Sequence, residues 1–383
     1  MFLKSLKLMN FRNYEHLNLE FKKNKTVILG GNAQGKTNLV EAICFVSVLD
    51  SQRCSSDLEL VRWGSENAFI GVEVEKKDTR PTELSVVINP GKAKTFKVNQ
   101  IKKKVFSDFL GKLAVVSFSV DDLLLLRGSP GDRRKYIDTA ICQIYPAYYT
   151  RIQNYNKVKQ QKQAMLKSFN GYFSNLSSVQ KDMLDSWNEQ IAVAGSNIIY
   201  LREKFLKEIF PVAREKNMQI SGSKDTLSIV YTTSLGLQFN CEKDPLSLIE
   251  DIKVSYLKKM KEKEEEEIQK GQVLVGPHRD DIIFSLDNKE AHMYASQGQQ
   301  RTTVLSLKLA ELDLIKQSLG ENPVLILDDV LAELDLARQL FLFESIGSEC
   351  QTIITTTDID SFKDKIMGDI SVFKVENGSI VDG

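Results

Sequence analysis

The chain carries the stretch GGNAQGKT at residues 30–37, which matches the phosphate-binding pattern G-x-x-x-x-G-K-[ST]. In such a loop, glycines let backbone N–H groups point at phosphate oxygens, and the following helix directs its positive N-terminal end at the same anion. A short apolar run at residues 27–29 precedes the loop, and apolar residues at helical spacing follow from Lys36 to about Val48. The pattern therefore predicts a strand, a phosphate-binding loop and a helix, the core unit of an α/β P-loop nucleotide hydrolase.

Every residue of this loop is a candidate contact to the nucleotide. Lys36 is expected to reach the β- and γ-phosphates, and the Thr37 hydroxyl is expected to ligate Mg²⁺. The complete set of candidate contacts in the loop is Gly30, Gly31, Asn32, Ala33, Gln34, Gly35, Lys36 and Thr37. The loop itself gives no base specificity.

A second stretch, VLILDD at residues 324–329, supplies the acidic partner that a phosphate-binding loop requires at the end of a buried strand. Asp328 is the candidate Mg²⁺ ligand, together with Thr37. Asp329 is the candidate that polarises the attacking water. The predicted catalytic group is therefore Lys36, Asp328 and Asp329.

A third stretch, SQGQQR at residues 296–301, lies just before a predicted helix and about 260 residues beyond the first loop. A serine hydroxyl, a glycine backbone and a glutamine at a helix N-terminus form a second anion site. Two anion sites in one chain are explained if the second completes the site of a neighbouring copy, through Ser296, Gly298 and Gln299 acting in trans. An ordinary N-capped helix is the alternative explanation of this stretch.

In this order the three stretches resemble the ABC-type ATPases, and specifically the branch that contains the SMC proteins and the RecF family. The stretch AELD at residues 332–335, which begins with Ala332 and ends with Asp335, resembles the loop that runs along the dimer interface of that class. LKLMNFRNY at residues 6–14 resembles the opening strand of the branch, which implies that Arg12 and Asn13 approach the nucleotide. TIITTT at residues 352–357 occupies the place of the switch strand.

The closer resemblance is to the RecF family, and it extends over the whole chain. It is carried by GKTNLVEA at 35–42, GSP at 128–130 with Arg133 and Arg134, VGPHRDD at 275–281, residues 296–301 and LDDVLAELD at 327–335. Membership of that family implies an ATP-dependent homodimer that binds DNA, both double-stranded and at gaps and single-strand/double-strand junctions. It further implies cooperation with RecR and RecO in loading recombinase, and a link to replication and the SOS response.

Several positions differ from the wider ABC pattern. Asp329 stands where glutamate is usual, so its carboxylate is one methylene shorter, which predicts slow hydrolysis suited to a switch. Threonines stand at the switch histidine, Gln297 replaces a signature glycine, and residues 115–122 show no convincing Q-loop glutamine.

The remaining sequence predicts an ATPase head in two parts, residues 1–128 and 271–383, with a mainly helical lobe inserted at 129–270. Gly128-Ser129-Pro130-Gly131 breaks the chain where its character changes. The predicted helices and strands lie at the following residues: helices at 155–169, 187–210, 245–269, 298–317 and 336–346, and strands at 69–75, 84–88, 113–118, 220–240, 273–275, 282–284, 324–327, 352–355 and 370–375.

Composition restricts the class of protein further. The 383 residues include 42% hydrophobic and 27% charged side chains, which is typical of a folded globular protein. Five scattered cysteines and three histidines argue against a zinc site and suit a reducing cytosol. No apolar run approaches the length of a membrane span, and residues 1–7 lack a signal-peptide core, so we expect a cytoplasmic protein without membrane association.

The 51 basic and 51 acidic side chains balance, so DNA binding would require a local cationic patch. Lysines that could form it are Lys157, Lys159, Lys162 and Lys167 and the run Lys102-Lys103-Lys104; solubilising roles are as probable for each. The charged run from Lys258 to Glu267 is predicted to be a solvated helix face. A transporter ATPase subunit, a P-loop kinase or GTPase, and a non-catalytic binding module remain alternative classes.

Overall fold

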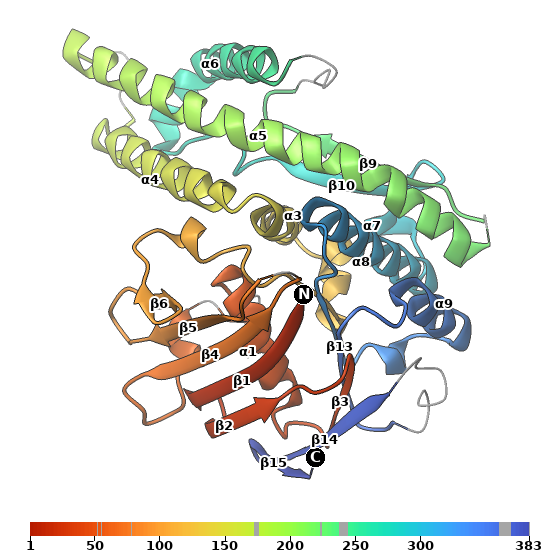
Figure 1. Ribbon diagram of the computed structural model, residues 1–383. Coiled ribbons are helices and arrows are strands. Elements are labelled where there is room, and N and C mark those ends of the chain that lie inside the picture. Colours follow the sequence, from red (N-terminus) through yellow and green to blue (C-terminus); the bar gives the residue numbers. More distant parts are fainter. Residues whose placement is uncertain are drawn as a thin grey trace.

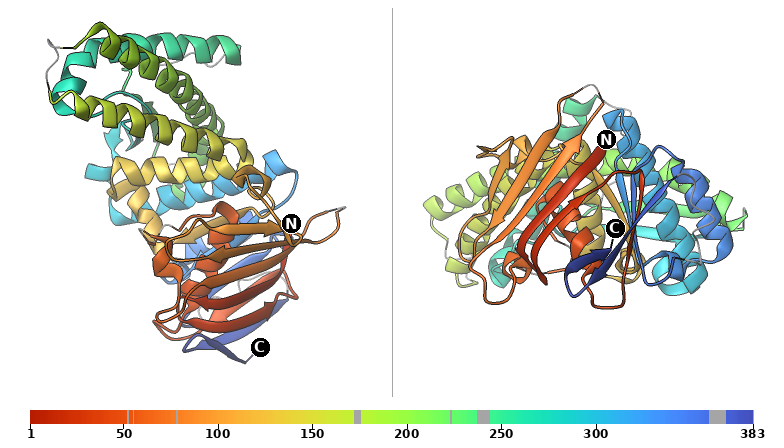
Figure 2. Two further views of the ribbon diagram at one scale, coloured as in Figure 1. Left: turned by 90° about the vertical axis from the view of Figure 1, so that its left-hand side faces the viewer. Right: turned by 60° about the horizontal axis from the view of Figure 1, so that its bottom comes forward.

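The computed structural model describes residues 1–51, 53–54, 56–77, 79–171, 176–222, 224–236, 244–359 and 369–382. Its head is built around helix α1 (Lys36–Val48), which lies between two six-stranded sheets, and a lobe of long helices rises from one side of the head (Figures 1 and 2). The fold is the mixed α/β architecture that the sequence predicts.

The first sheet is antiparallel and contains the N-terminal strands. Its order is β2-β1-β4-β5-β6-β7, formed by β1 (Phe2–Phe11), β2 (Tyr14–Glu20), β4 (Ala68–Glu75), β5 (Thr82–Ile88), β6 (Thr95–Val98) and β7 (Ile101–Lys102). Leu6 and Leu8 of β1 are buried while Lys7 between them is exposed, as the alternation of apolar and polar residues requires. One face of this sheet packs on α1.

The second sheet joins the two ends of the chain. Its order is β15-β14-β3-β13-β12-β8, formed by β15 (Ser379–Asp382), β14 (Ile370–Glu376), β3 (Lys25–Leu29), β13 (Thr352–Thr356), β12 (Val324–Asp328) and β8 (Val115–Ser119). The strands from β14 to β8 are parallel, and β3 lies between two strands from the last third of the chain. Because parallel strands end at the same edge, the phosphate-binding loop after β3 and the acidic pair after β12 meet there.

The lobe consists of α3 (Pro130–Ile144), α4 (Ala147–Ser168), α5 (Ser178–Ser221) and α6 (Pro245–Lys270), with a small sheet of β9 (Leu227–Thr232), β10 (Asp281–Leu286) and β11 (Lys289–Glu290). Helix α7 (Ala291–Tyr294) leads into α8 (Gln297–Leu319), which packs against α5, and α9 (Leu336–Ile346) lies beside α8. Short helical turns complete the chain: η1 (Asp57–Leu60), η2 (Phe106–Asp108), η3 (Val120–Leu123), α2 (Leu124–Arg127) and η4 (Leu331–Glu333).

Most of the predicted elements form, but three differ. The helix predicted at 187–210 is a single 44-residue helix, α5, capped by Ser177 and ended by Gly222 in the left-handed conformation. Residues 273–275 are not a strand: Val273 and Val275 are buried among side chains rather than paired in a sheet. Of the segment predicted as strand at 220–240, 227–232 form β9, and 223 and 237–240 lie outside the described residues. Strand β9 pairs with β10, so this sheet crosses the predicted boundary at 270/271.

Among the described helices, none combines the length and the apolar character that a bilayer crossing requires.

Lys162 is not available to contact a ligand, contrary to the expectation from sequence. Its side chain is fully buried between α4 and α6, where its ammonium lies 2.6 Å from the Glu267 carboxylate. Burial lowers the pKa of Lys162, and Glu267 opposes that effect. Glu267 and Glu264 are also buried, so the run from Lys258 to Glu267 is solvated on one side only.

Replacing Lys162 by methionine should lower the free energy of unfolding by about 3–5 kcal/mol, because Glu267 would remain buried without its cation. A double replacement, Lys162→Met with Glu267→Leu, should recover most of that loss, since no buried charge is left. Urea denaturation followed by circular dichroism measures both. Equal destabilisation in the single and double variants would contradict the ion pair as the cause.

Candidate nucleotide-binding site

The loop at residues 30–37 connects β3 to α1 and requires glycine at two positions for steric reasons. A Cβ atom on Gly30 would lie 2.6 Å from the carbonyl oxygen of Val375 in β14. Gly35 adopts φ 117°, and a Cβ there would lie 2.7 Å from the side-chain amide of Asn13. The backbone therefore folds tightly over the start of α1, as a phosphate-binding loop must.

Lys36 lies inside this loop. Its ammonium donates hydrogen bonds to the carbonyl oxygens of Gly30 at 3.0 Å and Gly31 at 3.1 Å, and it lies 3.6 Å from the Asp329 carboxylate. The side chain is buried, whereas that of Asp329 is half-exposed. Asp329 has φ 52°, a left-handed conformation that aspartate tolerates and that β-branched residues avoid. This conformation turns the second acidic residue toward the loop.

Thr37 and Asp328 meet at the beginning of α1. The Thr37 hydroxyl donates to Asp328 Oδ1 at 3.2 Å, and the Thr355 hydroxyl of β13 donates to the same oxygen at 2.6 Å. Burial raises the pKa of Asp328, and the Asp329 charge adds to that effect, while the bonds from Thr355 and Thr37 oppose it. The backbone N–H of Asp329 donates to Thr355 Oγ1 at 2.9 Å, so one threonine of the predicted switch strand positions both acids.

The oxygen atoms of Thr37 and Asp328 fit the chemistry of Mg²⁺. Magnesium prefers hard oxygen ligands and is usually held by one or two protein groups, water and substrate phosphates rather than by a complete protein cage. No group of three or more His, Cys, Asp or Glu side chains that could hold a metal occurs among the described residues. The two oxygens therefore form a partial site of the kind that a nucleotide-bound magnesium uses.

The structure places Asn13 at the loop and ties Arg12 to α1. Asn13 donates to the carbonyl oxygen of Gln34 at 3.1 Å, and Asn38 donates to Asn13 at 2.8 Å. The Arg12 guanidinium makes two bonds to the buried Glu41 carboxylate, at 2.9 and 2.7 Å, and one to the carbonyl of residue 59. Arg12 is thus held beside the loop by an ion pair with its helix.

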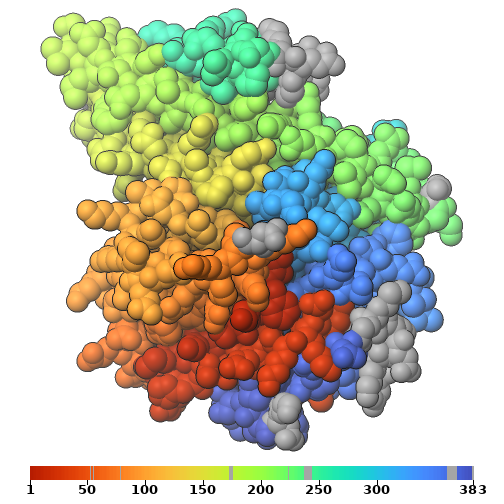
Figure 3. Space-filling model, in the orientation of Figure 1, coloured from red at the N-terminus to blue at the C-terminus, as the bar shows by residue number. Residues whose placement is uncertain are grey.

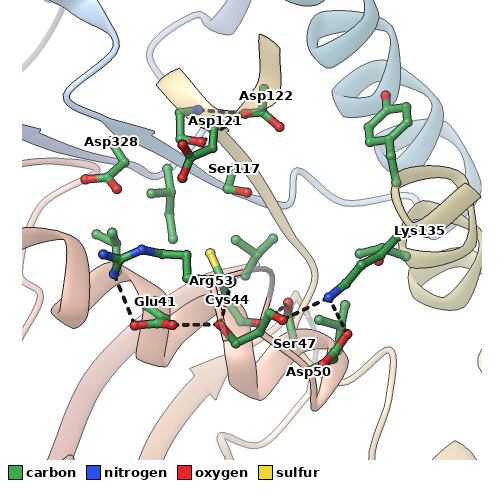
Figure 4. A pocket seen from close by; sticks show the side chains of 18 of the residues that line it. Glu41, Cys44, Ser47, Asp50, Arg53, Ser117, Asp121, Asp122, Lys135 and Asp328 are labelled. Carbon is green, nitrogen blue, oxygen red and sulfur yellow. Dashed lines mark hydrogen bonds and ion pairs between the residues drawn. The ribbon is translucent and has the colours of Figure 1, made fainter. Parts of the chain in front are cut away.

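Sequence reasoning missed Arg53. Its guanidinium donates to Asn38 at 3.2 Å and to Glu41 at 3.2 Å (Figure 4). Arg53 also lines the hollow of the phosphate-binding loop together with Asp329. Its charge lowers the pKa of Asp328. A single arginine in a loop has no spacing pattern, so no sequence signal was available. Its side chain is 40% exposed, which leaves the guanidinium accessible from the hollow.

A deeper pocket continues from Thr37 and Asp328 along α1 toward α3 (Figure 4). Its walls include Ser117 of β8 and Asp121 of η3, in the segment 115–122 where no glutamine was found. Lys308 of α8 pairs there with Asp122 at 3.1 Å, in a buried contact. The helix that begins with the third sequence stretch is therefore packed directly against the wall of this pocket.

Ser296 acts as the N-cap of α8. Its hydroxyl accepts from the Gln299 N–H at 3.3 Å, and its own N–H donates to the Gln299 side chain at 2.9 Å. The Gly298 carbonyl accepts from Thr302 at 3.0 Å. Ser296 is exposed, and the described residues that line the phosphate-loop hollow include none of Ser296, Gly298 and Gln299. The ordinary capping role is therefore present within one chain.

The predicted interface loop is also at the surface. Ala332 is exposed in η4, and Asp335 caps α9 by accepting from the Arg338 N–H at 2.9 Å. Arg338 in turn donates to the Gly298 carbonyl at 3.1 Å, which links this loop to the start of α8. Met293 and Tyr294, shortly before Ser296, and Leu336, directly after Asp335, are apolar side chains that are 67%, 69% and 58% exposed.

Comparison with known proteins shows the family of the chain. The family model described as RecF/RecN/SMC N terminal domain matches residues 2–380. DNA replication and repair protein RecF of Clostridium tetani is 40% identical over 382 residues, covering 100% of both chains, and that of Bacillus subtilis is 38% identical over 381 residues, also covering 100% of both.

Solved structures lead to the same family. A structure of the recombination mediator protein RecF with ATP, in the RecFOR pathway, is similar with a TM-score of 0.88 and 31% identity, covering 99% of this chain and 96% of that one. The Smc head domain of Pyrococcus furiosus is similar in fold alone, with a TM-score of 0.54 and 17% identity over 99% and 95% of the two chains. These full-length matches favour a DNA-repair protein over a transporter subunit. The chain belongs to the RecF family of DNA replication and repair proteins, within the RecF/RecN/SMC group.

Proposed function

We propose that the chain binds ATP with Mg²⁺ at residues 30–37 and hydrolyses it slowly. The observation that carries this proposal is the convergence of Lys36, Thr37, Asp328 and Asp329 from two distant parts of the chain at one sheet edge. Bound magnesium supplies charge neutralisation for the phosphates. Thr37 and Asp328 would hold it, Lys36 would pair with the phosphates, and Asp329 would orient and polarise the attacking water.

The nucleotide site is completed by a second copy of the chain. In this proposal Ser296, Gly298 and Gln299 contribute the α8 N-terminus in trans, and Ala332 and Asp335 lie in the interface. Support comes from the exposure of Ser296 and from exposed apolar side chains in the same two loops, Met293 and Tyr294 before Ser296 and Leu336 after Asp335, since homodimer interfaces are enriched in apolar surface.

The dimer acts as an ATP-dependent DNA-binding switch in recombinational repair. We infer that it binds double-stranded, gapped and single-strand/double-strand junction DNA in the cytoplasm and helps load recombinase together with RecO and RecR. Relatives named as replication and repair proteins over the full length, and as a mediator in the RecFOR pathway, support this role.

Sedimentation velocity tests the dimer and the switch together. Wild type and Ser296→Arg are compared with and without ATP–Mg²⁺, and again with gapped DNA. We expect only wild type to dimerise with ATP, and DNA to strengthen the dimer. Binding of ATP without dimerisation under every condition would reject the shared site.

Asp329→Asn should bind ATP with near wild-type affinity, hydrolyse it roughly 100-fold more slowly and accumulate as the ATP-bound dimer, because the amide cannot polarise the water. Phosphate release and sedimentation on the same sample measure both effects. Wild-type turnover in this variant would remove Asp329 from the catalytic group.

A further inference from the structure

Helix α4 differs from the other long helices in its charge. None of its 22 residues is aspartate or glutamate, although its exposed side carries lysines and many amides. By contrast, α6 pairs its lysines with its own glutamates, for example Lys261 with Glu264 at 2.8 Å and Lys263 with Glu266 at 2.7 Å. Apart from Lys162, which pairs with Glu267 of α6, the cations of α4 form no ion pair with a described residue, so this helix is a local source of positive charge in a chain of zero net charge.

Three cations from different elements converge beside α4: Arg134 of α3, Lys159 of α4 and Arg279 of the 275–281 turn. Arg134 lines a hollow together with Asn156 and His278; Lys159 lies one helical turn beyond Asn156, and Arg279 directly follows His278. In keeping with this placement, burial, followed by the charges of Arg134 and Arg279, lowers the pKa of Lys159. Within the described ranges, none of them forms an ion pair within 4.0 Å, because the nearby acids are engaged elsewhere. Asp281 pairs with Arg133 at 2.7 Å, and Asp138 pairs with Arg202 at 2.8 Å.

The same place is hollowed and lined by polar side chains. Arg134, His278 and the α4 amides Gln153 and Asn156 line one hollow, which lies between α3, α4 and α5 and reaches the end of α1. Helices α3 and α4 lie at the junction of the head and the lobe (Figures 1 and 3). Because residues of these helices line the hollow, it lies at the base of the lobe. Cations with amide donors beside them are the groups that contact phosphate and sugar in protein–DNA interfaces.

The 275–281 turn is held rigidly from below. Gly276 has φ 131°, and a Cβ there would lie 1.8 Å from the Tyr256 hydroxyl. That hydroxyl donates to the Val275 carbonyl at 2.9 Å, and buried Arg202 donates to the Pro277 carbonyl at 2.6 Å. These contacts place the neighbouring Arg279 on a preorganised backbone, which reduces the entropy that binding has to overcome.

His278 joins the turn to α4 as a neutral group. Its Nδ1 lies 2.6 Å from the Tyr155 hydroxyl and its Nε2 lies 3.0 Å from the Val273 carbonyl. Burial, with the charges of Lys159, Arg279 and Arg134, lowers the pKa of His278 to about 4. At neutral pH, Nε2–H therefore donates to Val273 and Nδ1 accepts from Tyr155, and the positive charge of the hollow comes from the two arginines and the lysine.

We propose that this cationic hollow, which is lined by Arg134, Gln153 and Asn156 and flanked by Lys159 and Arg279, binds the phosphate backbone of DNA. The inference rests on the proposed DNA-binding function and assigns it a surface. Two lysines of α4 differ in this respect: Lys159 lies one helical turn beyond Asn156, beside the hollow, whereas Lys162 pairs with Glu267 inside the lobe. The hollow would contact the charged phosphates and not the base edges, so it would contribute affinity and orientation but no sequence specificity.

The test compares two double variants that remove the same charge. Lys159→Gln with Arg279→Gln removes two cations of the hollow, and Lys261→Gln with Lys263→Gln removes two cations of α6 that are paired with glutamates. Duplex binding is measured by fluorescence anisotropy in the presence of ATP at several salt concentrations. The hollow variant should bind at least about tenfold more weakly at low salt, and its plot of log K against log salt should be shallower by about 2, because each phosphate contact contributes roughly 0.9. The α6 control should match wild type.

A double variant that keeps both positive charges tests whether weaker DNA binding results from a folding defect. Lys159→Arg with Arg279→Lys should keep the wild-type salt slope, and ATP affinity and thermal unfolding should be unchanged in every variant. If wild type binds duplex and the hollow variant shows the same slope, the hollow is not the DNA surface although the proposed function stands. If wild type with ATP binds no DNA at any salt concentration, the proposed function itself fails and the hollow with it.

Discussion

Lys36→Met should lose at least about 100-fold in ATP affinity, because charge-assisted contacts to phosphate are the strongest that this loop offers. Lys36 is the only residue of the loop 30–37 with a positive side chain, and it faces the carboxylate of Asp329. Without its ammonium, the polyphosphate would meet Asp328 and Asp329 with no cation from the loop between them. Methionine has nearly the same length, so the packing around the buried stem is kept.

Calorimetric titration with ATP–Mg²⁺ measures the loss directly. Thermal unfolding without nucleotide serves as the control, because the bonds of the Lys36 ammonium to the described residues are those to Gly30, Gly31 and Asp329. We expect the unfolding temperature to change little. Wild-type affinity in the variant would show that the phosphates bind elsewhere.

Ser296→Arg should abolish ATP-driven dimerisation and hydrolysis while the phosphate-binding loop still binds ATP. The exposed hydroxyl of Ser296 caps α8 at the surface where the second copy is proposed to dock. An arginine side chain at this position would keep the N-terminus of α8 away from the phosphate bound by that copy. The change also removes a cap, which costs about 0.5–2 kcal/mol of stability. A control must therefore distinguish the effect of losing the helix cap from the effect of blocking the interface.

Ser177→Arg provides that control. Ser177 caps α5 with the same reciprocal pattern, accepting from the Gln180 N–H at 3.2 Å, and it is exposed and outside every predicted site. Its replacement should lower stability by a similar amount and leave dimerisation and hydrolysis intact. Equal loss of dimerisation in both variants would attribute the effect of Ser296→Arg to helix fraying.

Mixing Ser296→Arg with Lys36→Met chains tests whether the site is shared. In a mixed dimer one composite site has both halves intact and the other has neither, so activity should return to roughly a quarter to a half of the wild-type rate per chain for a symmetric dimer. Phosphate release from the separate and mixed variants measures the recovery. Absence of any recovery would count against action in trans.

Local sequence was sufficient to locate the residues of the nucleotide site. Each of its three motifs can be recognised within about ten residues: the glycine spacing, the apolar run that ends in two acids, and the capped helix. This is possible because backbone conformation and periodicity are local properties. In the structure β3 pairs with β13 and β14, so one sheet joins strands from the two ends of the chain.

Contacts between distant residues could not be predicted in this way. Arg53 reaches the loop through Asn38 and Glu41, and Thr355 orders both acids, although neither residue stands out in its own segment. Lys159 and Lys162 have the same charge and neighbouring positions on one helix, yet Lys159 lies beside a cationic hollow whereas Lys162 pairs with a buried glutamate. The sequence by itself determined the fold class and the phosphate chemistry, whereas the tertiary structure decided which charges are neutralised, because burial and pairing depend on elements that meet only after folding.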